Sequence, residues 1–359
     1  MSNKVGVAII GCGNIAKAYA ANLVSYPEIK LVGAADLEFQ RAQALATRHG
    51  IRAYPSVEAL LADSEVDVVV NLTIHHAHKA VTRQCLEAGK HVHSEKPLAL
   101  TYQDAQSLVD LAAAKELRLG CSPFTFLGEI QQTAWKTLRE GRTGTIRVIY
   151  AEVNWGRIET WHPAPEPFYQ VGPLFDVGVY PLTLITAIFG PARRVAAYGT
   201  VLQPDRFSQE GHPFRVDTPD FVVAAVELAS GPLIRLTTNF YVGSHSKQRG
   251  LEFHGDAGSL YLSDWHNFDG SVEFATFGQA YQSVPLVKQP YGGPGKVEWG
   301  RGTLDLVQAI LENRPHRATG QQATHIVEIL CAIAESMKTS QPISIESNFT
   351  PPAPMGWAS

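Results

Sequence analysis

The sequence predicts an α/β protein of two domains: a doubly wound parallel sheet at the N-terminus, then an α+β domain built on an open, mainly antiparallel sheet. Its 359 residues exceed what one hydrophobic core usually organises. Up to about residue 122, short β-branched runs alternate with Ala-rich helical segments, which is the pattern of βαβ units. Beyond that point, strand-like runs follow one another across short turns, which favours antiparallel pairing. We therefore expect domains at 1–122 and 123–359.

The first domain is predicted to alternate strands with helices. Gly50 and Gly89 follow two of the helices, as expected where a helix ends in a left-handed residue. Thr101 or a neighbour is expected to cap another helix. The predicted strands are 5–10, 29–35, 66–72, 90–93 and 117–120, and the predicted helices are 15–23, 39–49, 78–88 and 101–115.

The second domain is predicted to begin with a helix and a long strand. Turn-forming sequences such as Ser230-Gly231-Pro232 separate the strands that follow. The predicted strands are 144–155, 194–201, 220–228, 233–241, 250–254 and 259–262, and the helices are 128–140, 303–312 and 321–338. The last helix can pack back on the first domain, and the Pro-rich segment 350–359 is expected to be irregular.

Composition and charge weigh against several classes of protein. The formal net charge is -4 and there is no long basic run, so charge does not favour a nucleic-acid partner. The four cysteines are far apart and form no CxxC pair, which speaks against a disulfide framework and a zinc knuckle. The apolar run after Lys4 is too short for a signal peptide, and no stretch reaches the roughly 18 apolar residues that span a membrane. We expect a cytoplasmic protein with no membrane partner.

A glycine-rich turn follows the first predicted strand and opens the first predicted helix. Gly11 permits the tight turn, Gly13 lets the backbone approach a pyrophosphate, and Ala16 keeps the helix close to the sheet. Asp36 ends the second predicted strand, where a carboxylate can bind the ribose hydroxyls of an adenosine. This order predicts a Rossmann dinucleotide site, and the alternative is a Gly-rich turn beside a surface aspartate. The expected cofactor-binding residues of this region are Gly11, Gly13, Asn14, Ile15 and Asp36.

Asp36 also bears on which dinucleotide binds. A carboxylate at this place repels a 2′-phosphate, so NAD is favoured over NADP. Arg41 keeps NADP possible, because an arginine near this strand end can bind that phosphate, although it can equally be a solvated helix residue.

Two histidine-containing segments, 73–78 and 91–97, follow the third and fourth predicted strands. Their histidines lie in different loops, and no carboxylate or cysteine set completes a site, so no metal is predicted. Loops at the carboxyl ends of parallel strands line the cofactor crevice, which places Lys96 near the nicotinamide. A lysine before a proline can also be a surface residue. The expected cofactor contacts in these segments are Thr73, His75, His78, Glu95 and Lys96.

The segment 157–169 is unusually aromatic for a predicted loop. Trp161 and Tyr169 suit stacking on a sugar ring, with His162 as a polar contact. Packing at an interface explains the same residues equally well. His245, after the end of a predicted strand, is a weaker substrate candidate.

Several motifs together carry a family resemblance. They are Gly11-x-Gly13-Asn14-Ile15-Ala16, Asp36, Thr73-x-x-x-x-His78, Ala88-Gly89-Lys90-His91-Val92, Glu95-Lys96-Pro97 and Asp176-x-Gly178-x-Tyr180-Pro181. In this combination the chain resembles the glucose-fructose oxidoreductase, inositol dehydrogenase and MocA family over nearly its whole length. The resemblance implies a Rossmann domain, a C-terminal open sheet that often mediates dimers or tetramers, and a catalytic lysine at Lys96.

Two positions depart from the pattern of many relatives. Tyr180 stands where many have a histidine, as in members resembling glucose-fructose oxidoreductase and dimeric dihydrodiol dehydrogenase. This departure indicates a subgroup and weighs against an inositol dehydrogenase. Ile74-His75 stands where relatives often have Pro-Asn, so the contacts of that loop are not carried over.

Lys96, Asp176 and Tyr180 are the predicted catalytic residues. Four positions separate Asp176 from Tyr180, so one helical turn can place both on the same side. A phenol with a reference pKa of about 10 is a poor base, but a nearby ammonium such as that of Lys96 favours the phenolate. Asp176 would hold Lys96 or bind a second substrate hydroxyl. The alternative for the pair is a helix cap beside a half-buried tyrosine.

The expected function is hydride transfer between nicotinamide and a secondary alcohol or carbonyl of a sugar, polyol or related small molecule. A dihydrodiol or xylose dehydrogenase would use the same residues on another substrate. A non-catalytic NAD(P)-binding regulator is a third possibility, which the presence of Lys96, Asp176 and Tyr180 together weighs against. The resemblance also leads us to expect a homodimer or homotetramer formed through the C-terminal sheet.

Overall fold

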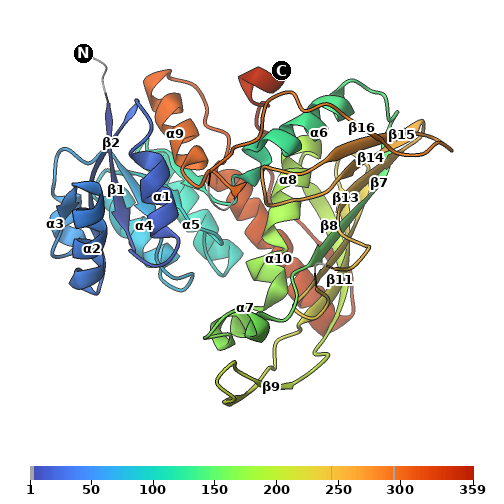
Figure 1. The fold of residues 1–359 in the computed structure, drawn as a ribbon, viewed down its shortest axis with the longest axis horizontal. Helices are drawn as coiled ribbons and strands as arrows, with labels where there is room; N and C mark the ends of the chain where they lie inside the picture. The colour runs from blue at the N-terminus through green and yellow to red at the C-terminus, as the bar shows by residue number, and fades with distance from the viewer. Residues whose placement is uncertain (1–3, 244, 294–295) are drawn as a thin grey trace. The chain divides into compact units, whose positions relative to one another are not determined.

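The chain folds into two compact units (Figure 1). The structure, a computed structural model, describes residues 4–243, 245–293 and 296–359. Residues 1–3, which the predicted first domain includes, lie outside this description. Unit 1 comprises Met1–Phe124 and Glu298–Val327, and unit 2 comprises Thr125–Val297 and Glu328–Ser359.

Unit 1 is built on a six-stranded sheet in the order β3-β2-β1-β4-β5-β6. Every neighbouring pair is parallel, which confirms the doubly wound prediction. β1 is buried along its whole length, as expected for a strand covered on both faces. The order reverses between β1 and β4, which is where such sheets bind ligands. The strands are β1 (Val5–Ile10), β2 (Ile29–Ala35), β3 (Arg52–Ala53), β4 (Val68–Asn71), β5 (His91–Ser94) and β6 (Leu119–Cys121).

The helices of unit 1 begin and end where local chemistry stops the backbone from continuing. Thr101 accepts a hydrogen bond from Asp104 N at 3.2 Å and caps α5, as predicted. Gly50 ends α2 in the left-handed conformation, with φ of 65°. The helices are α1 (Ala16–Leu23), α2 (Phe39–His49), α3 (Val57–Leu61), α4 (His78–Glu87), α5 (Tyr102–Ala114) and α9 (Arg301–Leu311). β3 and α3 were not predicted, because elements this short show no readable periodicity.

Unit 2 is built on a nine-stranded sheet in the order β16-β15-β14-β13-β7-β12-β11-β8-β17. β7 and β12 run parallel, and the other neighbours are antiparallel, so the sheet is mixed but mainly antiparallel, as expected. The strands are β7 (Ile146–Asn154), β8 (Ala192–Thr200), β11 (Phe221–Leu228), β12 (Leu233–Asn239), β13 (Gly250–Gly255), β14 (Gly258–Leu262), β15 (Val272–Thr276), β16 (Gln282–Ser283) and β17 (Ile343–Ser344).

A separate two-stranded hairpin leaves this sheet between β8 and β11. It consists of β9 (Asp205–Phe207) and β10 (Pro213–Arg215), which pair antiparallel. This hairpin was not predicted, because each of its strands has only three residues. Two 3₁₀ turns, η1 (Thr125–Leu127) and η2 (Ile158–Thr160), precede helices of the same unit.

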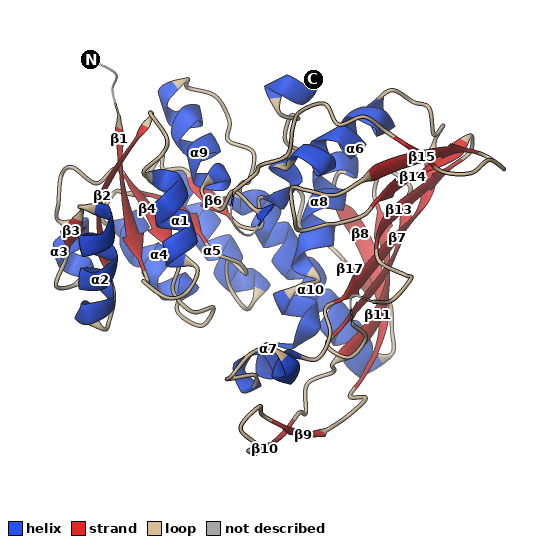
Figure 2. Cartoon of the chain, in the orientation of Figure 1, coloured by secondary structure: helices blue, strands red, loops and turns tan. Residues whose placement is uncertain are grey.

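Helices cover one face of the nine-stranded sheet (Figure 2). α6 (Glu129–Arg139) packs on β14 and β15, and α7 (Glu166–Asp176) packs on β11 and β12. α8 (Val179–Phe189) follows α7 directly, and α10 (Gly320–Thr339) contributes residues to both units. The opposite face of the sheet carries exposed side chains such as Tyr198, Val223 and Leu233.

α7 and α8 form the apolar centre of unit 2. Within α7, Gly172 has φ of 77°, which kinks the helix just before Pro173. The segment Glu166–Phe189 is long and apolar enough to cross a membrane by length and composition. However, 78% of its most apolar window is buried inside the protein, as in the core helix of a globular unit.

The Pro-rich end of the chain is irregular, as predicted, except for the 3₁₀ turn η4 (Gly356–Ala358). It lies against α6 of its own unit. Met355 N donates to Gln132 Oε1 at 2.8 Å, and the Lys288 ammonium lies 5.1 Å from the centre of the Trp357 ring. The segment therefore acts as a strap over α6.

Candidate functional site

The glycine turn of unit 1 is held by Asp36. The Asp36 carboxylate accepts from Cys12 N at 2.7 Å and from Glu38 N at 2.8 Å, which ties the end of β2 to the turn after β1. Gly11 has φ of 94°, and a Cβ there would lie 2.6 Å from the Leu72 carbonyl carbon. Only glycine fits this position. A Cβ at Gly13 would meet nothing within 4 Å, so the turn has open space on the side that a diphosphate needs.

A cavity of about 600 Å³ lies beside this turn. Its walls include the predicted residues Gly13 and Asn14, and also Lys17, Arg41 and Arg48. Three cationic side chains, Lys17 from the first turn of α1 and Arg41 and Arg48 from α2, suit an anionic ligand. Lys17 and Arg48 were missed in the sequence because each resembles an ordinary solvated helix residue. Arg41 also forms an exposed ion pair with Glu38 at 2.8 Å.

Cys12 lines the same cavity but is not a nucleophile. Burial raises the pKa of its thiol to about 12, and the nearby Asp36 carboxylate adds to the rise. The thiol therefore stays protonated at neutral pH. The residues around the turn fit a dinucleotide, which Gly13 and Asn14 would hold at its diphosphate and Asp36 at its ribose.

His78 connects the loop after β4 to the segment after β5. Its Nδ1 lies 2.7 Å from Pro97 O and its Nε2 lies 2.9 Å from Thr73 O, and the ring is only 2% exposed. Burial lowers the pKa of this imidazole, and the two carbonyls only partly offset that effect. His78 was predicted to contact the cofactor. In the structure both of its ring nitrogens face backbone carbonyls of the protein. His75 remains half-buried in the loop after β4, where its ring centre lies 4.5 Å from that of His76.

The backbone of Lys96 is held by the residue before it. The Glu95 carboxylate accepts from Lys96 N at 3.1 Å, from Tyr19 OH at 2.6 Å and from Ser122 Oγ at 3.0 Å. Glu95 is 9% exposed, whereas Lys96 is half-buried. Tyr19 lies in α1, Ser122 directly follows β6, and Lys96 is the next residue along the chain, so three separate donors hold the Glu95 carboxylate. The backbone of Lys96, close to the carboxyl end of β5, is therefore held in place by Glu95.

The histidines of unit 1 do not form a metal site. Within residues 4–243, 245–293 and 296–359, no three His, Cys, Asp or Glu side chains are grouped so that they could hold an ion.

In unit 2, Asp176 and Tyr180 lie on either side of the short break between α7 and α8. Asp176 is the last residue of α7, and Tyr180 is in the first turn of α8. Asp176 is half-buried and Tyr180 is 7% exposed.

An aromatic box, made of Trp155, Trp265 and His266, lies beside Tyr180, which contacts Trp265 and His266. The Tyr180 ring centre lies 5.5 Å from that of Trp265 and 5.0 Å from that of His266, which it meets edge-on. Trp155 stands 5.7 Å from Trp265 and is 36% exposed, so the box is open on its side. Sequence reasoning missed this group because Trp265 and His266 follow β14, about 85 positions after Tyr180.

Trp161 and His162 form a second aromatic group with Phe168. The His162 and Phe168 ring centres are 4.8 Å apart, and Trp161 lies 5.9 Å from Phe168. Trp161 is 48% exposed, and His162 Nδ1 takes part in a tight turn with Ala164. The structure therefore brings two of the predicted substrate residues together on the surface of unit 2.

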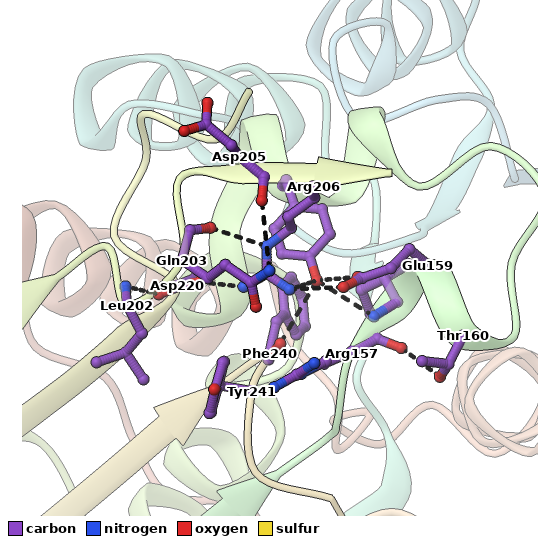
Figure 3. A network of polar contacts seen from close by, with 12 residues as sticks. Arg157, Glu159, Thr160, Leu202, Gln203, Asp205, Arg206, Asp220, Phe240 and Tyr241 are labelled. Atoms are coloured by element: carbon purple, nitrogen blue, oxygen red, sulfur yellow. Dashed lines mark hydrogen bonds and ion pairs between the residues drawn. The ribbon is translucent and has the colours of Figure 1, made fainter. Parts of the chain in front are cut away.

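The other two predicted substrate residues lie elsewhere. Tyr169 is 3% exposed, and its hydroxyl donates to Glu159 and accepts from Arg206 at 2.9 Å. Figure 3 shows the polar network to which Arg206 and Glu159 belong. His245 is exposed in the loop between β12 and β13.

Comparisons with known proteins agree with this architecture. A family model described as "Oxidoreductase family, NAD-binding Rossmann fold" matches residues 5–122. A model described as "GFO/IDH/MocA C-terminal domain" matches residues 131–261. The two matches fall on unit 1 and unit 2 respectively.

Individual relatives are similar over parts or all of the chain. Trans-1,2-dihydrobenzene-1,2-diol dehydrogenase of Macaca fuscata fuscata is 32% identical over 186 residues, which are 51% of this chain and 55% of that protein. dTDP-3,4-didehydro-2,6-dideoxy-alpha-D-glucose 3-reductase of Streptomyces antibioticus is 31% identical over 241 residues, 64% of this chain and 70% of that protein. The chain thus spans little more than half the length of the first relative.

Solved structures extend the likeness of fold to nearly the whole chain. The crystal structure of an NAD binding oxidoreductase from Klebsiella pneumoniae superposes with a TM-score of 0.85 at 21% identity, covering 96% of this chain and 100% of that one. At this identity the likeness shows the fold.

Proposed function

Because the chain belongs to the glucose-fructose oxidoreductase, inositol dehydrogenase and MocA family of oxidoreductases, we propose that it transfers a hydride between a nicotinamide dinucleotide and a secondary alcohol or carbonyl. The proposed substrate is a sugar, a polyol or a ring diol. The observation that carries the proposal is the cavity beside the Gly11–Gly13 turn, together with Lys96 on its rigid support after β5. A bound nicotinamide would supply the hydride acceptor or donor.

We assign the proton chemistry to the chain's own side chains. In the direction of oxidation, the Tyr180 side chain acts as a phenolate, favoured by the Lys96 ammonium, and takes the proton of the substrate hydroxyl while the carbon loses its hydride. Lys96 is proposed to act on the same oxygen, where its ammonium stabilises the negative charge that develops. Asp176 accepts a hydrogen bond from a second substrate hydroxyl. In the direction of reduction, Tyr180 returns the proton.

The aromatic box supports a substrate with a flat or C–H-rich ring face. Trp155 offers the exposed ring of that box, and aromatic rings stack well on such faces. A dihydrodiol and a pyranose both present a face of this kind. The diol dehydrogenase and the sugar-nucleotide reductase to which the chain is similar motivate both substrate classes.

NAD is the proposed preferred cofactor, and NADP is the second candidate. The Asp36 carboxylate faces the glycine turn, where it disfavours a 2′-phosphate. Arg41 and Arg48 in the wall of the same cavity are the side chains that could still accept one.

We also propose a homodimer or homotetramer assembled through the uncovered face of the nine-stranded sheet. Tyr198 is 71% exposed there, and its antiparallel partner Val223 on β11 is 37% exposed. Apolar residues grouped on a sheet face are typical of subunit contacts. The four free cysteines suit the cytoplasm, which is the proposed location.

A turnover screen tests the proposed function. The purified protein is incubated with NAD or NADP and, one at a time, trans-1,2-dihydrobenzene-1,2-diol, D-xylose, D-glucose and myo-inositol, and reduced cofactor is followed by absorbance. We expect turnover of at least one diol or sugar, with NAD preferred. Tight NAD binding without turnover of any compound would instead favour a regulatory protein.

A further inference from the structure

The hairpin β9–β10 directs one charged side chain into the interior of unit 2. Asp205 and Phe207 of β9 face outward, with Phe207 64% exposed, whereas the Arg206 side chain is 0% exposed. Phe214, which pairs with Arg206 across the hairpin, lies on the same face. Burying a guanidinium is unfavourable unless every donor finds a partner, so its surroundings have to supply them.

Arg206 has such partners on every side. Its Nη1 donates to Glu159 Oε1 at 2.8 Å and its Nε donates to Gln203 O at 3.1 Å. Its Nη2 forms an ion pair with Asp220 (Figure 3). Asp220 is itself fully buried and also accepts from Leu202 N at 2.7 Å. Although burial disfavours its charge, the contact with Glu159 and the other partners raises the pKa of Arg206, so it stays cationic.

Tyr169 of α7 is the second centre of this network. The Arg206 guanidinium lies 4.6 Å above its ring, and Phe214 lies 5.7 Å away, so both inward side chains of the hairpin contact it. The Tyr169 hydroxyl donates to Glu159. It accepts from Ile158 N at 3.3 Å and from Arg206 Nη1 at 2.9 Å. Burial, and then the bond to Glu159, raise the pKa of this phenol, so it remains a donor.

Three of these contacts reach η2, the turn that leads into Trp161 and His162. Glu159 is bound by Arg206 and Tyr169, and Ile158 N is bound by Tyr169. Trp161 N and His162 N both donate to Ile158 O, at 3.1 and 2.9 Å. The backbone of the aromatic loop is therefore one hydrogen bond away from a buried charged cluster.

We propose that Arg206 is a positioning residue for substrate recognition: it clamps η2 to α7 and so fixes where Trp161 and His162 stand. The clamp explains why the chain includes the β9–β10 hairpin at this point of the sheet. The part that concerns substrate rests on the proposed function, because it requires Trp161 and His162 to contact the ligand. The clamp itself rests on the hydrogen bonds alone.

Three readouts separate the clamp from the function. Hydrogen–deuterium exchange of peptides covering 157–163 reports the order of the loop without any ligand. Steady-state kinetics with a compound from the substrate screen reports KM and kcat, and titration with NADH reports cofactor binding. The variants are Arg206→Met, which keeps the aliphatic part of the side chain, and Arg206→Lys, which keeps the positive charge but loses the planar guanidinium with its several donors. Arg215→Met, in the same hairpin but exposed, is the matched control.

We expect exchange in 157–163 to speed up about tenfold in Arg206→Met and less in Arg206→Lys, with Arg215→Met unchanged. KM should rise about tenfold while kcat changes less than about threefold, because the loop binds substrate but does no chemistry. The NADH dissociation constant should stay the same. Unchanged exchange in 157–163 would overturn the clamp.

Faster exchange with an unchanged KM would overturn the role in recognition and leave the proposed hydride transfer intact. Conversely, a wild-type protein that turns over none of the compounds would count against the proposed function, and loop exchange alone would then decide the clamp. If Arg206→Met does not fold, Glu159→Gln serves the same test, since it keeps the shape of the side chain but removes the carboxylate that Arg206 and Tyr169 bind. Wild-type exchange in that variant would also refute the proposal.

Discussion

Single residues of unit 1 show how burial sets charge. His93 is fully buried, with its Nε2 3.4 Å from Ser122 Oγ. Burial, and then the nearby His316, lower its pKa to about 3, so the ring is neutral in the folded protein at every pH near neutrality. An unfolded histidine has a pKa of about 6.5 and binds a proton below it. Stability contributed by the neutral ring is therefore complete above about pH 6.5 and is lost as the pH falls toward 3.

Replacing His93 should make the protein less sensitive to acid. Between about pH 6.5 and pH 5, one such histidine lowers the free energy of unfolding by about 2 kcal/mol. His93→Leu should remove this part of the loss, which urea unfolding at the two pH values would measure. His212→Gln, at an exposed hairpin position, is the control and should keep the wild-type dependence. Equal acid losses in His93→Leu and wild type would contradict the assignment.

Residues of the site could be predicted where their roles are local in sequence. Gly11, Gly13 and Asp36 were predicted because strand, turn, helix and acid follow a fixed order. His266 and Arg206 could not be, because their partners Tyr180 and Glu159 lie far away along the chain and no periodicity connects them. Tyr169 was predicted to bind substrate from its aromatic neighbours, but its contacts are those of a buried hub.

At the scale of elements, long and strongly patterned segments were predictable, and short ones were not. The strands of unit 1 other than β3, and the helices α6, α9 and α10, fall within a few residues of their expected bounds. The helix α7 was not predicted, and its first residues fall in the aromatic segment 157–169, which was predicted to be a loop. In the structure, tertiary packing keeps the chain helical on both sides of the kink, where Gly172 adopts φ of 77°.

The kink makes Gly172→Ala a destabilising change. The left-handed backbone disfavours a side chain, and the new Cβ would lie 2.9 Å from Thr218 Cγ2. We expect the free energy of unfolding to fall by about 1–3 kcal/mol, measured by thermal unfolding. Gly278→Ala has a similar φ of 78° but no neighbour within 4 Å, so it isolates the backbone strain. A loss in Gly172→Ala no larger than in Gly278→Ala would show that Thr218 yields without cost.

At the scale of the whole molecule, the two-unit architecture could be predicted because the two sheets differ in the order of strands and helices along the chain. The change from alternating strands and helices to consecutive strands marks the passage from unit 1 to unit 2. Within Glu298–Val327, which returns to unit 1, only the last helix was expected to pack on the first domain, because the sequence of a helix such as α9 does not show which core it joins. Assembly into a dimer or tetramer also belongs to this scale. The proposed contact surface is the uncovered face of the nine-stranded sheet.

Charges placed on that face should separate the subunits. Tyr198→Glu combined with Val223→Glu puts two carboxylates on neighbouring strands of the uncovered face, which no apolar contact tolerates. Sedimentation velocity should show the wild type as a dimer or tetramer and the variant as a monomer. Phe277→Glu is the control, since Phe277 is 80% exposed in the turn after β15. A monomeric wild type, or a variant that assembles normally, would refute the proposed surface.

The most direct test of the account is the rate of hydride transfer in a single turnover, measured by stopped-flow absorbance with NADH already bound and a carbonyl substrate added. Lys96→Ala and Tyr180→Phe should each slow this step by about two orders of magnitude or more, while the NADH dissociation constant changes little. Near-normal rates in either variant would contradict the proposal that an ammonium at position 96 and a phenol at position 180 carry the chemistry.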